Sequence, residues 1–230
     1  MLKRILVIGL AFVVLNLGCQ SVPGEVLTDV KTTPTVIAGR QDEEAYKVRV
    51  EIVLSYADVQ AYPELFQAYV GALQEWANVL PVEFIVMVPE EGSTVTTSDI
   101  RRERRGVVMV NFTHNIPSKE DQNNLGIWFP KVRVMNLDLD DMYIGGIFNA
   151  SLARAVSLHE LGHMFGLPHI GNTGELNIQV GDLTVNHGAE FMMMHPQIPG
   201  KTENVVISRM EAEYAKRYLL TVFSYDAQNF

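Results

Sequence analysis

The spacing of three histidines constrains this chain more than any other feature of its sequence. His159 and His163 are four residues apart in a stretch that we expect to be helical, residues 149–165, so their side chains share one helix face and can reach one metal ion. A catalytic zinc site takes three protein ligands and keeps one position open. The two histidines therefore need a third ligand from outside the helix.

The residues that follow can supply this third ligand. Gly166 can adopt the left-handed conformation that turns the chain sharply at the end of a helix, and Pro168 prevents the helix from resuming. His169 can then return to the same metal ion. Glu160 lies beside the first ligand and can take a proton from a water molecule that zinc acidifies. The pattern predicts a site with ligands His159, His163 and His169 and with Glu160 as the base.

Two segments resemble the metzincin family of zinc peptidases. Residues 159–169, HELGHMFGLPH, match the family pattern HExxHxxGxxH at every fixed position, and residues 191–196, FMMMHP, resemble the methionine turn of that family. We expect Met194 to be the turn methionine, because matrixins have Met, an aromatic residue and Pro in sequence. The run of three methionines leaves Met193 as the alternative. Ile170 assigns the chain to no subfamily.

The resemblance implies an α+β fold with a metzincin-like catalytic domain over residues 45–230. Its sheet would be mixed and mostly parallel with an antiparallel edge strand, and it would have an active-site helix and a C-terminal helix. The implied activity is that of a zinc-dependent endopeptidase with one catalytic Zn²⁺, in which a zinc-activated water hydrolyses the peptide bond and Glu160 is the general base. The edge strand at Gly126, Ile127 and Trp128 would hold a protein or peptide substrate, and Pro196 would line the side-chain pocket.

A non-catalytic surface lipoprotein that binds zinc or a partner is the alternative function. A structural zinc site takes a fourth protein ligand and has no use for a carboxylate beside the first histidine. Glu160 is therefore the residue that separates the two functions.

The N-terminus has the pattern of a secretory signal. A short basic start and an apolar run end at Gly18 and Cys19, and the run is too short to span a bilayer as a mature helix. A cysteine directly after a small residue resembles bacterial lipoprotein signals, which implies a lipidated Cys19, a membrane anchor and an extracytoplasmic location. Asn16 departs from that pattern, so ordinary secretion stays open. Residues 1–18 are then the signal peptide, and residues 19–44 are expected to be a tether.

Periodicity along the chain predicts the remaining elements. Alternating apolar residues predict a strand over residues 46–56, and helical spacing predicts a helix that begins at Pro63 and ends before Pro81. The other expected elements are strands over 82–88, 107–112, 125–129 and 132–137 and a late helix over 208–223.

The charge of the chain excludes one class of partner. A formal net charge of -9 argues against binding to nucleic acid, which needs a basic face. Asp138, Asp140 and Asp141 alternate partly like the oxygen ligands of Ca²⁺, with an acidic turn after a strand as the alternative. His187 could touch the zinc site or be an ordinary loop histidine, and we expect His114 to be the polar end of a strand.

Overall fold

A six-stranded sheet forms the centre of the protein. The computed structural model describes residues 32–38, 48–93, 96–103, 106–114, 116, 125–169, 176–180, 183–187, 193–194 and 202–228. The strands of this sheet are β1 (Thr32–Ala38), β2 (Val48–Leu54), β3 (Val82–Pro89), β4 (Val108–Thr113), β5 (Gly126–Phe129) and β6 (Val134–Asp138). They lie in the order β1-β3-β2-β4-β6-β5. The inner four strands are parallel, while β1 and β5 are each antiparallel to their neighbour.

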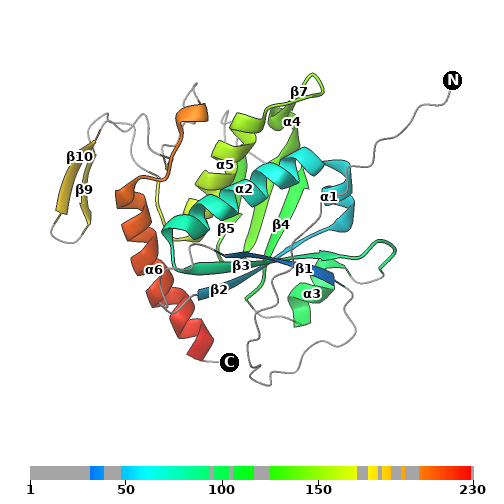
Figure 1. Cartoon of the computed structure of the whole chain (residues 1–230), viewed down its shortest axis with the longest axis horizontal. Helices are drawn as coiled ribbons and strands as arrows, with labels where there is room; N and C mark the ends of the chain where they lie inside the picture. The colour runs from blue at the N-terminus through cyan, green and yellow to red at the C-terminus, as the bar shows by residue number, and fades with distance from the viewer. Residues whose placement is uncertain are drawn as a thin grey trace.

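Helices lie on both faces of this sheet. They are α1 (Tyr56–Ala61), α2 (Pro63–Val79), α3 (Thr97–Glu103), α4 (Leu139–Met142), α5 (Ala150–Met164), the short 3-10 helix η2 (Thr202–Asn204) and α6 (Arg209–Gln228). The pair α2 and α5 covers one face, and α3 lies on the other (Figure 1). Two small hairpins complete the described structure: β7 (Tyr143–Ile144) with β8 (Ile147–Phe148), and β9 (Leu176–Val180) with β10 (Leu183–His187).

The core consists of two clusters of buried residues, one on each face of the sheet. In β3, Phe84 and Val86 are buried in the large cluster beneath α2 and α5, whereas Met87 belongs to a second cluster with Ile100 of α3. Successive strand residues point to opposite faces, so a single strand can serve both clusters. The larger core therefore lies between the sheet and α5, the helix that carries the histidines.

The predicted architecture is confirmed at the level of fold class. The structure is α+β, with a mixed and mostly parallel sheet and an antiparallel edge strand at β5. Each expected strand and helix is present within a few residues of its expected bounds. Among the residues that the structure describes, no helix is both long and apolar enough to cross a membrane.

One segment differs from expectation. Residues 32–38, which we assigned to the tether, form strand β1 and pair with β3 from Thr32↔Pro89 to Ala38↔Glu83. The sheet therefore has a second antiparallel edge, and the folded domain includes part of the expected tether. This segment lacks clear alternation, and its pairing partner lies about fifty residues away in the chain, so local periodicity could not indicate it.

Candidate metal centre

Helix α5 is held firmly within the core. At its start, Asn149 Oδ1 accepts a hydrogen bond from the Leu152 N–H at 3.1 Å. In its middle, the Trp76 indole N–H of α2 donates to Leu158 O at 3.2 Å. Arg154 makes two contacts of 2.6 Å with the Glu75 carboxylate of α2. These contacts fix the backbone next to His159.

The turn after α5 directs the third histidine back toward the helix. Gly166 has a φ of 78°, its N–H donates to His163 O at 3.0 Å, and the Leu167 N–H donates to Gly162 O at 3.0 Å. This pair of bonds is the Schellman motif, which requires a left-handed residue at this position. The Tyr218 ring of α6 also occupies the space that a Cβ on Gly166 would need. The turn predicted at Gly166 is confirmed, and two independent constraints require glycine there.

The three predicted histidines come together at their Nε2 atoms. His169 Nε2 lies 3.0 Å from His159 Nε2 and 3.0 Å from His163 Nε2. Among the described residues, these three form the one group of at least three His, Cys, Asp or Glu side chains whose ligand atoms all lie within 4.8 Å of one another. The structure therefore assembles a three-nitrogen centre from one helix and the turn behind it.

Hydrogen bonds at the opposite ring nitrogens define the tautomers of two of these rings. His159 Nδ1 lies 2.7 Å from Met193 O, and His163 Nδ1 lies 2.8 Å from Leu167 O. A carbonyl oxygen can only accept, so each Nδ1 carries the proton, and in its neutral form each ring directs an Nε2 lone pair toward the centre. Burial lowers the pKa of His163, and although the Leu167 hydrogen bond opposes this, the charge of His169 adds to the lowering. Neutral rings with converging lone pairs are what a metal ion needs.

The donor set fits a metal of the imidazole-binding class. Ligand nitrogens about 2.0–2.1 Å from one tetrahedral zinc lie a little over 3 Å apart, close to the observed spacing. Each of the two Nδ1–H groups donates to a backbone carbonyl, as metal-bound histidines usually do. Three imidazoles suit zinc and also copper, iron or nickel, so the geometry supports a metal ion without identifying it.

Glu160 lies buried between α5 and the edge strand β5. Its side chain is 4% exposed, and within the described structure Oε2 has no hydrogen-bond partner. Burial raises the pKa of Glu160 to about 8, although a hydrogen bond from the Trp128 backbone N–H acts in the opposite direction. A Cβ on Gly126 would lie 2.7 Å from Glu160 Cγ, so glycine lets the carboxylate lie directly against the strand. A buried carboxylate oxygen without a protein partner, in the residue next to His159, points to a water molecule or an ion as its partner.

Two methionines of the expected methionine turn, Met193 and Met194, lie against helix α5 at Gly162. Met193 and Met194 are buried, and Met194 Sδ and Met193 Cε fill the space where a Cβ on Gly162 would be. Both methionines approach Gly162, so their positions do not distinguish which of them is the turn methionine. Met194 stays our prediction, with Met193 as the alternative. The Met194 N–H donates to Glu211 Oε1 of α6 at 3.0 Å. Sequence reasoning missed Glu211.

The remaining predicted site residues fall into two groups. Gly126, Ile127 and Trp128 form the half-buried edge strand β5 beside Glu160. Cys19, Pro196 and the side chain of His187 lie outside the described part of the structure.

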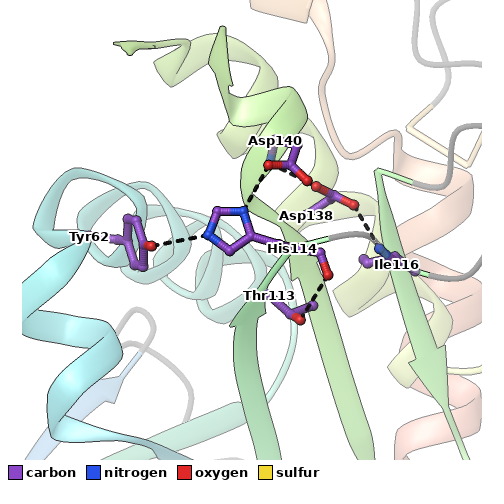
Figure 2. Close-up of polar contacts among 6 residues, drawn as sticks. All are labelled: Tyr62, Thr113, His114, Ile116, Asp138 and Asp140. Atoms are coloured by element: carbon purple, nitrogen blue, oxygen red, sulfur yellow. Dashed lines mark hydrogen bonds and ion pairs between the residues drawn. The ribbon is translucent and has the colours of Figure 1, made fainter. Parts of the chain in front are cut away.

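A second polar cluster lies at the carboxyl ends of β4 and β6 (Figure 2). His114 Nδ1 is 2.8 Å from Asp140 Oδ1, and its Nε2 is 3.4 Å from the Tyr62 hydroxyl. Asp138 accepts from the Ile116 N–H at 3.0 Å and from the Asp140 N–H at 2.8 Å, and the second bond caps α4. Burial raises the pKa of Asp141, and the charges of Asp138 and Asp140 add to this. The carboxylates of Asp138 and Asp140 already bind protein groups, which favours the acidic-turn alternative over Ca²⁺ ligands.

Comparison with known proteins assigns no family to the chain. No family model matches it, and no curated protein matches it. One similar solved structure is described as "Structure of a chaperone-substrate complex", with 12% sequence identity and a TM-score of 0.39. The similarity covers 78% of this chain, which spans only 39% of the chain in that structure. Similarity at this level supports no statement about fold or function.

Proposed function

We propose that this chain is a zinc-dependent endopeptidase of the metzincin type. One observation carries the proposal: the Nδ1–H groups of His159 and His163 bind carbonyl oxygens, so their Nε2 lone pairs converge with His169 Nε2 at 3.0 Å. Imidazole nitrogens that converge on one point, with their opposite ring nitrogens bound to carbonyl oxygens, are the arrangement that holds a metal ion. The family resemblance of residues 159–169 and the position of Glu160 add the peptidase activity to this metal site.

Glu160 would serve as general base and then as general acid. When bound by the three histidines, zinc would supply Lewis acidity that polarises the scissile carbonyl and lowers the pKa of a water molecule. Glu160 follows His159 directly, so it points off the face that the ligands share. Its carboxylate takes a proton from the attacking water and passes this proton to the leaving amine.

Strand β5 would hold the substrate in register with Glu160. It is the last strand of the sheet, so an extended peptide can pair with its outer edge. Gly126 brings the strand backbone against the Glu160 side chain, and the Trp128 N–H donates to the Glu160 carboxylate. A peptide on this edge would present its backbone beside both the base and the three nitrogens.

The proposed location rests on the N-terminal pattern. We propose that Cys19 is the lipidated first residue of the mature chain and that the domain lies outside the cytoplasm. Mass spectrometry of the mature N-terminus tests this. An acylated Cys19 is the expected result, and cleavage elsewhere or an unmodified cysteine would contradict the membrane anchor.

A peptide-library digest read by mass spectrometry tests the activity. Zinc-loaded protein should cut internal peptide bonds, and a chelator should stop this cutting until zinc is restored. Glu160→Ala should keep its zinc and lose about 10²–10⁴-fold in rate, the usual contribution of general acid–base catalysis. Full turnover by this variant would contradict the mechanism. A wild type that binds zinc and cuts nothing in the library would instead favour the non-catalytic lipoprotein.

A further inference from the structure

The Glu211 carboxylate does more than helix capping requires. Glu211 lies in the first turn of α6 and is 1% exposed. Its backbone N–H donates to Ser208 Oγ at 3.2 Å, and the Ser208 N–H donates to Glu211 Oε2 at 2.8 Å. This reciprocal pair is the capping box that begins many helices. The capping box accounts for one of the two carboxylate oxygens, Oε2.

The other oxygen reaches toward the histidine cluster. Glu211 Oε1 accepts from the Met194 N–H at 3.0 Å, across 17 residues of sequence. The carbonyl of the same peptide group, Met193 O, lies 2.7 Å from His159 Nδ1. A single peptide unit is therefore bonded at both ends, to a carboxylate at its N–H and to a metal-site histidine at its C=O.

This arrangement has a definite electrostatic effect. A carboxylate at the N–H end of a peptide group polarises that group and places more negative charge on its carbonyl oxygen. Met193 O then becomes a stronger acceptor for the Nδ1–H of His159. A stronger bond at Nδ1 fixes the tautomer and the ring orientation and makes Nε2 a more basic ligand, as a carboxylate does when it binds a metal-site histidine directly.

His163 provides an internal comparison. Its Nδ1 lies 2.8 Å from Leu167 O, a bond of similar length. The carbonyl of Leu167 belongs to the peptide group whose nitrogen is that of Pro168, which has no N–H. No carboxylate can polarise this peptide group through an N–H, so the two helix histidines differ in this one respect.

We propose that Glu211 is a positioning residue that orients and activates His159 as a metal ligand through the Met193–Met194 peptide group. The inference rests on the metal site of the proposed function and names a residue of α6 that acts on it.

Zinc affinity measured by chelator competition on the full chain tests the proposal. Glu211→Gln keeps the size of the side chain and an acceptor oxygen but removes the charge. We expect its zinc affinity to fall about 10-fold, at the lower end of the 10–100-fold typical for residues that support metal ligands. Ser208→Ala is the matched control, because it removes the cap of the same helix and leaves the Met194 contact. Its affinity should stay within about twofold of wild type.

The results separate this inference from the proposed function. A wild type that binds no zinc contradicts both. If the wild type binds zinc and Glu211→Gln binds it equally tightly, the inference alone is wrong. Equal losses in Glu211→Gln and Ser208→Ala would also overturn it, since capping would then explain the effect.

A second measurement needs no substitution, and it decides the question if Glu211→Gln does not fold. In the NMR spectrum of zinc-loaded wild type, the Nδ1 proton of His159 should resonate downfield of the Nδ1 proton of His163, because its acceptor is more polarised. Equal shifts, or the reverse order, would contradict the relay. In a folded Glu211→Gln, the His159 signal should move upfield while the His163 signal stays in place.

Discussion

Among the described residues, histidines and carboxylates come together in the α5 cluster and in the β4–β6 cluster, and only the α5 cluster has the geometry of a metal site. In the α5 cluster, the Nε2 atoms of His159, His163 and His169 converge, and His159 and Glu160 are buried. In the β4–β6 cluster, His114 lies between Asp140 and Tyr62, and the His114 and Asp140 side chains are 58% and 52% exposed. There the Asp138 and Asp140 carboxylates contact protein groups, and neither residue belongs to the group of converging ligand atoms found among the described residues. Convergence of ligand atoms on one point, rather than closeness of polar residues, distinguishes a metal site from a surface network.

The largest difference between the two clusters should appear in zinc affinity when one histidine is removed from each. His169→Ala should lower zinc affinity by about 10²–10⁴-fold, since three or four ligands share a binding free energy of about 10–16 kcal/mol. His169 is exposed, so the fold should survive its loss. His114→Ala should leave the affinity within about twofold of wild type. Chelator competition measures both variants, and equal losses would contradict the assignment.

Removal of the buried charge should stabilise the zinc-free protein in a pH-dependent way. Burial raises the pKa of Glu160 from 4.5 to about 8 in the folded chain. Between these values the folded state holds a proton that the unfolded state has lost, so wild-type stability falls as pH rises through this window. The stability of Glu160→Gln does not fall in this way, because glutamine does not titrate. Above pH 8 this variant should be more stable than wild type by on the order of 2–4 kcal/mol, and the difference should shrink toward pH 4.5.

Denaturant unfolding in the presence of chelator measures this difference. A constant gap at all pH values would show that the charge of Glu160 is not its source. Asp140→Asn, in the exposed cluster, is the control and should show no comparable trend, because solvent screens its charge.

Two helix glycines should respond in opposite directions to the same substitution. Gly162→Ala would force a methyl group into the space of Met194 Sδ and Met193 Cε, and should cost about 1–3 kcal/mol of stability. Gly71→Ala in α2 meets nothing within 4 Å and should add about 0.5–1 kcal/mol through helix propensity. Thermal unfolding of the zinc-free variants measures both, and a neutral Gly162→Ala would show that the methionines do not pack so closely.

The smallest effect is expected at the exposed ion pair. Asp140→Asn weakens the contact with His114 and should change stability by less than about 1 kcal/mol, the usual range for exposed pairs. Zinc affinity should not change. A loss of zinc in this variant would mean that the two clusters are coupled, which their separate hydrogen-bond networks do not predict.

Local sequence signals predicted the features of the site that local chemistry determines. The four-residue spacing of His159 and His163, and the sequence from Gly166 to His169, were sufficient to predict the shared helix face and the sharp turn behind it. Alternation located β2, and runs of branched or apolar residues located β3 and β4. The Gly145–Gly146 pair between β7 and β8 was a turn signal that we did not use.

The features that the sequence could not predict depend on long-range contacts. Gly126 and Glu160 are far apart in the chain, and nothing near Gly126 indicates that a carboxylate will lie against it. Ser208 and Glu211 form a capping box that predicts the start of α6, but not the bond from Glu211 to Met194. The strand over residues 32–38 forms by antiparallel pairing with the edge of β3. Such contacts depend on how elements pack, which no local pattern specifies.

The zinc K-edge X-ray absorption spectrum of reconstituted protein, recorded with its metal content, tests the metal centre most directly. We predict one zinc per chain with three imidazole nitrogens and one further light-atom ligand at about 2.0–2.1 Å. His169→Ala should lose one imidazole contribution. A metal ratio well below one, a sulfur ligand, or fewer than three imidazoles in the wild type would contradict the assignment of His159, His163 and His169.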